Sequence, residues 1–226
     1  MAETAEAPRV AIVGGTGALG GGLAKRFAAA GIPVLLGSRT ADKAEAAAAE
    51  LSAETGSAVE GLENAAAAAA GDVVFVTVPF ASQADTMRAI AAATAGKVVV
   101  DTTVPLRPPK VARVQLPPEG SAAALAAAAL GEGARLVTGL HSVSAQKLRK
   151  GEAIEADVLL FGDEVEAREE VGTLLARIGL RCLHGGPLAN AVAAEAMTSV
   201  LIGINKRYGV AEGAGIRITG IAEPAG

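Results

Sequence analysis

The stretch Arg9-Val10-Ala11-Ile12-Val13-Gly14-Gly15-Thr16-Gly17-Ala18-Leu19-Gly20 decides the fold of this chain. Residues 10–13 are all apolar and predict a buried strand, and an Ala-rich helical segment follows the glycines. In the pattern Gly-x-Gly-x-x-Gly, Gly15 permits a tight turn, Gly17 lets the backbone approach a pyrophosphate, and Gly20 lets the helix pack on the strand. We therefore predict a dinucleotide site whose phosphates meet free N–H groups at a helix N-terminus. The alternative is a glycine-rich turn without a ligand.

The end of the next apolar strand indicates which dinucleotide is bound. This strand, 34–36, runs into Gly37-Ser38-Arg39-Thr40. NAD sites usually carry an acidic residue about 20 residues beyond the glycines. Here Ser38 and Arg39 stand at that place, and Lys43 follows one helical turn later. A hydroxyl, a guanidinium and an ammonium group suit a 2′-phosphate, so the sequence predicts NADP. The alternative is that both cations belong to an ordinary solvated surface.

The composition limits the class of protein. A chain of 226 residues is long enough for one α/β core with a small appendage. The net charge of −4 argues against general nucleic-acid binding, which requires a strongly positive surface. Cys182 is the only cysteine, so the chain forms no internal disulfide, and we expect it to work in a reducing cytoplasm. We interpret Cys182 as a small buried hydrophobe, and the sequence offers no Cys/His cluster for a metal.

Two expectations concern membranes and targeting. Residues 1–8 lack the apolar segment of a signal peptide and are expected to form a frayed tail. No unbroken apolar stretch free of glycine and charge reaches roughly 18 residues, so we predict no membrane span.

Strands and helices alternate in the order of a Rossmann-type, doubly wound, mostly parallel sheet. We expect strands at 10–13, 34–36, 73–78, 98–100, 136–137, 158–161 and 180–183, and a short one near Val59. We expect helices at 18–30, 41–55, 64–70, 83–93, 122–130, 164–178 and 191–204. The proline-rich stretch 102–120 is expected to be irregular, and 216–218 to resemble a short strand. The predicted division is an NADP-binding domain at 9–187 and a small helical part at 188–226.

The other strand ends offer mostly small, apolar or hydroxyl groups, without a carboxylate pair or a nucleophile beside a base. Hydride transfer needs none of these, because the cofactors carry the chemistry. His141 is the candidate proton donor, and the alternative is a histidine that satisfies its own loop. Asp101 and Asp163 are expected to cap turns or helices. Two basic clusters are surface charges or hold an anionic tail of a second substrate: Lys147, Arg149 and Lys150, and Lys206 and Arg207.

Short motifs spread from Val10 to about Thr219 resemble those of the NADPH-dependent coenzyme F-420 reductases, also called F-420:NADP oxidoreductases. These motifs are Gly14-Gly15-Thr16-Gly17-Ala18-Leu19-Gly20, Gly37-Ser38-Arg39, Thr77-Val78-Pro79, Val104-Pro105-Leu106, Gly120-Ser121-Ala122-Ala123, His141-Ser142-Val143, Phe161-Gly162-Asp163, Gly186-Pro187-Leu188-Ala189-Asn190 and Gly215-Ile216-Arg217-Ile218. The resemblance implies an oxidoreductase that exchanges a hydride between NADP(H) and F-420, a deazaflavin with a phosphate and glutamate tail. It also implies a homodimer in which the C-terminal part, 188–226, helps to form the interface.

The resemblance assigns roles to individual residues. It places Thr16, Gly17, Ala18 and Leu19 at the pyrophosphate, and Ser38, Arg39 and Lys43 at the 2′-phosphate. Along the rest of NADP it places Val78, Val104, Ala145 and Ala214. On the deazaflavin side it places His141, Pro187, Leu188 and Asn190.

Two alternatives to F-420 reduction stay open. The chain departs from the family pattern at Ala189, where serine is common, and at Met197-Thr198-Ser199, where Leu-Thr-Pro is common. Both departures lie on the deazaflavin side. One alternative is therefore an NADPH-dependent reductase of a flavin, a ferric complex or an imine. The other is a protein that senses NADP without catalysis.

Overall fold

The computed structural model describes residues 7–221 and contains one eight-stranded sheet in the order β3-β2-β1-β4-β5-β6-β7-β8. The strands are β1 (Val10–Val13), β2 (Val34–Ser38), β3 (Val59–Glu63), β4 (Val73–Val76), β5 (Val98–Asp101), β6 (Arg135–Thr138), β7 (Val158–Phe161) and β8 (Cys182–Gly186). All neighbours pair in parallel except β6 and β7, which are antiparallel. The order of the first six strands is that of the Rossmann fold, so the predicted fold class is confirmed.

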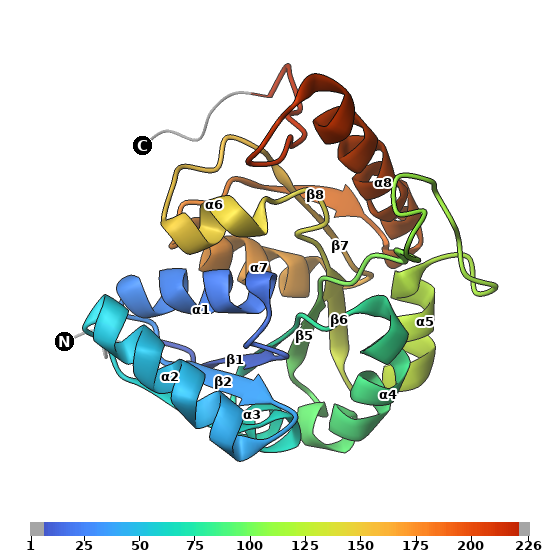
Figure 1. Ribbon diagram of the computed structural model, residues 1–226. Helices are drawn as coiled ribbons and strands as arrows, with labels where there is room; N and C mark the ends of the chain where they lie inside the picture. The colour runs from blue at the N-terminus through green and yellow to red at the C-terminus, as the bar shows by residue number, and fades with distance from the viewer. Residues whose placement is uncertain (1–6, 222–226) are drawn as a thin grey trace.

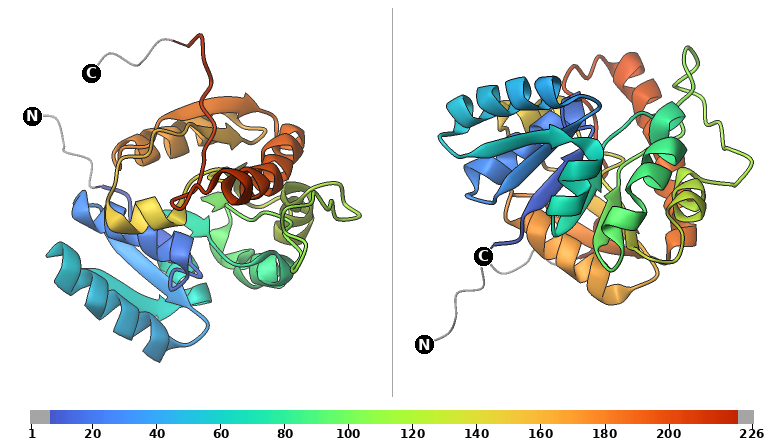
Figure 2. Two further views of the ribbon diagram at one scale, coloured as in Figure 1. Left: turned by 45° about the horizontal axis from the view of Figure 1, so that its top comes forward. Right: turned by 90° about the horizontal axis from the view of Figure 1, so that it is seen from below.

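Helices cover both faces of this sheet (Figures 1 and 2). They are α1 (Ala18–Ala29), α2 (Ala41–Thr55), α3 (Asn64–Ala70), α4 (Phe80–Ile90), α5 (Ala122–Leu130), α6 (Ala145–Lys150), α7 (Val165–Ala176) and α8 (Ala191–Tyr208), with short 3₁₀ turns at Ala92–Thr94 and Leu188–Asn190. One apolar cluster contains side chains of α1, α2, α6 and α7, and a second contains those of α3, α4 and α5.

The alternation of side chains along the central strands builds these two layers. In β1, Val10 and Ile12 belong to the first cluster, whereas Ala11 and Val13 belong to the second. In β4, Phe75 faces the first layer and its neighbour Val74 the second. A strand buried on both faces needs apolar residues throughout, which is why these strands read as continuous apolar runs.

Several predicted boundaries are wrong, and the structure supplies the reasons. Strand β4 ends at Val76 instead of Val78, because its neighbours β1 and β5 also end at this level. Helix α4 begins directly after Pro79, its N-cap, instead of at Gln83. Strand β8 spans 182–186 instead of 180–183. The strand includes Gly185 and Gly186. Gly185 packs against the Phe161 ring of β7 so closely that a Cβ there would lie 2.2 Å from the ring, so only glycine fits at this place in the strand.

Smaller differences occur in short segments. The short helix α6 was not predicted; its N-cap is Ser144, whose hydroxyl accepts a hydrogen bond from the Lys147 amide. The strand expected at 216–218 is absent from the described residues, and this segment bonds to Asp157 instead. Residues 102–120 are irregular, as predicted. Most of the expected frayed tail, residues 1–6, lies outside the described part of the chain.

Helix α8 lies beside α5, on the side of the molecule away from α2 (Figure 1). Its buried Glu195 accepts hydrogen bonds from the amides of Ala122 and Ala123 at the start of α5. The segment Leu188–Tyr208 is long and apolar enough to cross a membrane by length and composition alone, and 28% of its apolar window is buried. The segment contains Glu195 and Gly203, so it is not an unbroken apolar stretch, and the absence of a membrane span stays a prediction.

Candidate active site

A cavity of about 750 Å³ lies at the carboxyl ends of the parallel strands, where the strand order reverses between β1 and β4. Such a switch point is the usual ligand site of an open α/β sheet. The loops after β1, β2, β4 and β5 supply most of its wall. Among the lining residues are Thr16, Gly17, Ala18, Leu19, Ser38, Arg39, Val78 and Val104, which the sequence singled out.

The first turn of α1 forms the phosphate-binding part of this cavity. Its N-cap is Gly17, which has no side chain to bond to the first amides of the helix. Thr16, Gly17 and Ala18 are exposed towards the cavity, so N–H groups and the positive end of the helix dipole remain available to an anion. These features fit the pyrophosphate of a dinucleotide.

Gly15 and Gly20 do not line the cavity; they shape the turn that forms it. A Cβ on Gly15 would lie 2.8 Å from the carbonyl oxygen of Ile12. A Cβ on Gly20 would lie 2.8 Å from Cα of Gly15 and 2.5 Å from Oγ1 of Thr77. Both positions therefore require glycine for the close packing of strand, turn and helix.

Asn64, the first residue of α3, was not predicted as a site residue. Its side-chain Oδ1 accepts a hydrogen bond of 3.0 Å from the amide of Gly14, where the chain leaves β1 with a positive φ of 75°. Asn64 also lines the cavity. The contact spans 50 residues, and an asparagine at the start of an alanine-rich helix gives no sign of it in the sequence.

Ser38 and Arg39 lie at the end of β2, on the cavity wall. Ser38 is buried, whereas Arg39 is exposed, and Lys43 is exposed in the first turn of α2. Within residues 7–221, neither Arg39 nor Lys43 has a hydrogen bond or ion pair with another side chain. Lys43 is not among the residues that line the cavity, but it lies one helical turn beyond the Ser38 hydroxyl and the Arg39 guanidinium. This set of groups is suited to bind a phosphate dianion.

A buried polar network supports the opposite end of the cavity. Asp101 is fully buried at the end of β5 and accepts hydrogen bonds from the Thr103 hydroxyl (2.7 Å) and from the Gln83 amide. Burial raises the pKa of Asp101 to about 6, against the lowering effect of these hydrogen bonds. Thr102, Thr103 and Val104 line the cavity, so Asp101 holds the loop that forms this wall. The expectation that Asp101 caps a turn agrees with its bond to the Thr103 amide.

His141 lies outside this cavity, in the loop after β6, and is 7% exposed. Its Nε2 is 2.9 Å from the Thr138 hydroxyl, and its Nδ1 has no hydrogen-bond partner among the described residues. Burial lowers the pKa of His141 to about 4. The preceding Leu140 has a φ of 66°, a strained conformation for a residue with a side chain. The imidazole is therefore neutral near pH 7 and presents an unpaired nitrogen.

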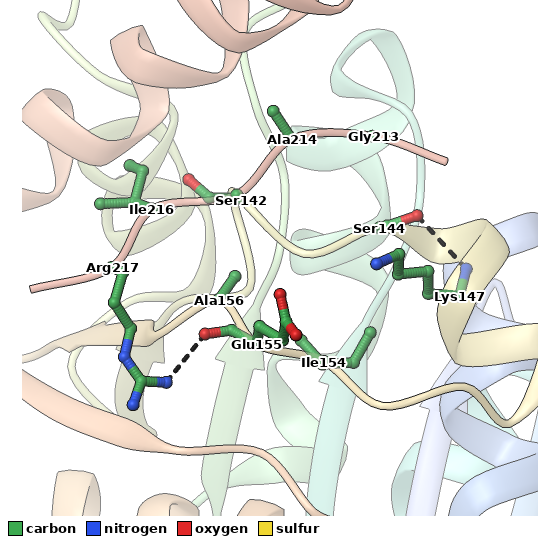
Figure 3. A pocket seen from close by; sticks show the side chains of 11 residues that line it. Ser142, Ser144, Lys147, Ile154, Glu155, Ala156, Gly213, Ala214, Ile216 and Arg217 are labelled. Atoms are coloured by element: carbon green, nitrogen blue, oxygen red, sulfur yellow. Dashed lines mark hydrogen bonds between the residues drawn. The ribbon is translucent and has the colours of Figure 1, made fainter. Parts of the chain in front are cut away.

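The other predicted site residues lie on two further segments. Ala145 is the first residue of α6, which packs on α1, and Ala214 lines a smaller hollow of about 260 Å³ beside Ser144 (Figure 3). Pro187, Leu188 and Asn190 form the turn between β8 and α8. That turn is held by a bond from the Leu188 amide to Asp163, which confirms the capping role expected of Asp163.

Taken together, the fold and the cavity define a Rossmann-type dinucleotide-binding protein. Comparisons with known proteins extend this result. A family model described as "NADP oxidoreductase coenzyme F420-dependent" matches residues 9–105. A protein of Methanothermobacter thermautotrophicus named "F420-dependent NADP reductase" is 40% identical over 95% of this chain and 96% of its own length. A protein of Methanocaldococcus jannaschii with the same name is 35% identical over 94% and 99%.

A solved structure agrees with the sequence relatives. The crystal structure of a putative F420-dependent NADP reductase from Arthrobacter sp. FB24 superposes with a TM-score of 0.80 and 26% identity, covering 93% of this chain and 98% of that one. The chain belongs to the family of F420-dependent NADP reductases. The resemblance stated from the sequence motifs is thereby confirmed.

Proposed function

We propose that this protein is an oxidoreductase that transfers a hydride between NADP(H) and coenzyme F-420. In the direction of F-420 reduction, NADPH, F-420 and one proton give NADP⁺ and reduced F-420. The observation that carries this proposal is the switch-point cavity with unpaired cations at the end of β2, in a chain of this family. The two redox molecules supply the chemistry of hydride transfer themselves, between nicotinamide C4 and deazaflavin C5.

The protein contributes binding, orientation and exclusion of water. The first turn of α1 binds the pyrophosphate through its amides, and Ser38, Arg39 and Lys43 bind the 2′-phosphate. The 102–104 loop, held by Asp101, orients the nicotinamide half. We assign His141 and the Pro187–Asn190 turn to the deazaflavin side, because both lie next to α8 and outside the NADP cavity.

The experiment that tests this proposal measures the absorbance of oxidised F-420 with purified protein and NADPH, with NADH as the control cofactor. Rapid bleaching with NADPH and slow bleaching with NADH is the expected result. Consumption of NADPH only when a flavin, a ferric complex or an imine replaces F-420 identifies one of the alternative acceptors. NADPH binding without any turnover identifies an NADP-sensing protein.

We predict that His141 contacts the deazaflavin as a neutral group and does not act as a cationic acid. Its pKa, lowered to about 4 by burial, means that the imidazolium forms only well below neutral pH. Between pH 5.5 and 8, the pH profile of kcat should therefore have the same shape in the wild type and in His141→Gln. An inflection that is present in the wild type and absent from His141→Gln would contradict this assignment.

We also propose that the protein is a homodimer that forms through α8. Met197, Val200 and Tyr208 lie at helical spacing on an exposed apolar face of α8. Val114 and Leu116, in the loop that the Ser199 hydroxyl bonds through the Arg113 carbonyl (3.4 Å), are further exposed apolar side chains near α8. A second copy that covers this face removes apolar surface from water.

The dimer is tested by light scattering on a double variant, Met197→Glu with Val200→Glu. Introducing two carboxylates into an apolar interface should convert dimer to monomer at micromolar concentration. Val165→Glu is the matched control, because Val165 is equally exposed but lies on α7, away from this face. A wild type that is monomeric, or that enters the membrane fraction through α8, would overturn the dimer proposal.

A further inference from the structure

The side chain of Asn64 forms a bridge across the end of β2. Asn64 directly follows β3, and its side chain passes over Gly37 of β2 to reach Gly14, which follows β1. Its Oδ1 accepts a hydrogen bond of 3.0 Å from the Gly14 amide. A Cβ on Gly37 would lie only 2.9 Å from this Oδ1, so a glycine at this place in β2 leaves room for the bridge.

The bridge fixes which end of the Asn64 amide stays free. The backbone N–H of Gly14 can only donate, so the atom that it meets is the oxygen, and the NH2 group occupies the other position. Within residues 7–221, Nδ2 of Asn64 bonds to no other residue, and it is not a buried atom. Asn64 lines the switch-point cavity. The side chain therefore offers N–H donors to a molecule that binds there.

The residues around Asn64 indicate which part of a dinucleotide it would meet. Gly14 begins the turn whose following amides bind the pyrophosphate in the proposed NADP site. Ser38 and Arg39, directly after Gly37, bind the 2′-phosphate in the same proposal. Asn64 contacts Gly14 and lies against Gly37, so it stands between these two parts of the site. In NADP the adenosine ribose joins the pyrophosphate to the 2′-phosphate, so this place belongs to the phosphorylated ribose.

A hydrogen-bond donor at this place favours NADP over NAD. The free 2′-hydroxyl of NAD is usually bound by a carboxylate, which accepts its proton. A 2′-phosphate dianion presents only acceptor oxygens, and N–H donors suit it. Glu63 precedes Asn64 and pairs with Ser38 in the sheet, but it does not line the cavity. The amide of Asn64 thus stands where an acidic residue would suit NAD.

We propose that Asn64 is a specificity-determining residue that donates from Nδ2 to the phosphorylated ribose of NADP. The inference rests on the proposed NADP binding and adds a contact from the end of β3 to those of Ser38, Arg39 and Lys43. The same amide holds Gly14 through Oδ1, so one side chain joins the glycine turn to the 2′-phosphate site.

The test measures the dissociation constants of NADPH and NADH for Asn64→Asp in the full chain, by titration calorimetry. This substitution keeps an oxygen for the Gly14 amide but replaces the NH2 group with a second, charged oxygen. We expect the dissociation constant of NADPH to rise at least about tenfold, equivalent to about 1.4 kcal/mol. The dissociation constant of NADH should stay the same or fall, because a carboxylate can accept the ribose 2′-hydroxyl. The melting temperature should stay unchanged.

Two further variants separate this contact from its alternatives. Ala65→Asp is the matched control, because it introduces the same charge at the next residue, which is exposed and does not line the cavity. NADPH affinity should change little in this control, because solvent screens the added charge. Asn64→Ala removes the bridge together with the donor, so it should lower Tm and weaken NADPH more than NADH.

The outcomes that overturn the inference are distinct from those that overturn the NADP site. Equal weakening of NADPH and NADH in Asn64→Asp and Asn64→Ala would show that Asn64 only supports the turn. Unchanged NADPH affinity in Asn64→Asp, or an equal loss in Ala65→Asp, would also refute the contact. A wild type that binds neither nucleotide overturns the proposed NADP site instead.

Discussion

Gly17→Asp is expected to abolish NADPH binding while the protein stays folded. Gly17 is the N-cap of α1, with φ −76° and ψ 171°, a conformation that any residue adopts. A Cβ there would meet only ordinary contacts, the nearest being the Gly14 carbonyl oxygen at 3.4 Å. Aspartate is a favoured N-cap residue, so the helix itself should not be weakened. The new carboxylate, however, occupies the amides that bind the pyrophosphate and repels its charge.

The measurement is the dissociation constant of NADPH, together with the melting temperature. We expect NADPH affinity to fall more than about 100-fold, which corresponds to about 2.7 kcal/mol, with an unchanged or slightly higher Tm. Gly17→Asn separates size from charge and should give a smaller loss. Gly20→Ala should behave in the opposite way and lower Tm, because its Cβ would overlap Gly15 and Thr77. NADPH affinity retained in Gly17→Asp would contradict the position of the pyrophosphate.

Removing both exposed cations at the end of β2, in Arg39→Ala with Lys43→Ala, is expected to relax the preference for NADPH over NADH. Neither cation has a protein partner among the described residues, so removal leaves no carboxylate uncompensated and should leave the fold intact. A charge-assisted hydrogen bond to a phosphate contributes roughly 1.5–3 kcal/mol, and less where solvent screens it. Two such bonds predict a loss of about 100-fold in NADPH affinity.

The ratio of kcat/KM for NADPH to that for NADH measures this change. The kcat/KM for NADH should differ from that of the wild type by less than about twofold, because NADH has no 2′-phosphate for these cations to contact. Arg88→Ala with Arg177→Ala is the control, since it removes the same charge from exposed positions elsewhere, one in α4 and one directly after α7. The NADPH preference of the double variant should also become less sensitive to salt. An unchanged cofactor ratio would refute the 2′-phosphate assignment.

Local sequence patterns specify many of the strands, turns and helices of this protein independently of its tertiary contacts. The apolar run 10–13 and the glycines after it specify a strand, a turn and a helix through backbone geometry alone. The end of strand 34–36 carries Ser38 and Arg39 instead of an acidic residue, and this too can be read from neighbouring positions in the sequence. Strand 73–76 and residues 98–100 of the next strand are apolar throughout because they are buried on both faces. Each of these features depends on neighbours in the chain, so the sequence displays them directly.

The tertiary structure decided the features that depend on distant residues. The antiparallel pairing of β7 with β6 joins Thr138 to Phe161, and Gly185 of β8 packs against the ring of Phe161. The bonds of Asn64 to Gly14 and of Glu195 to Ala122 join residues 50 and 73 positions apart. Asp157, the residue before β7, accepts a hydrogen bond from the amide of Ile218, 61 residues further along the chain. Periodicity and propensity carry no information about such meetings, because the physical cause is the close packing of the folded chain.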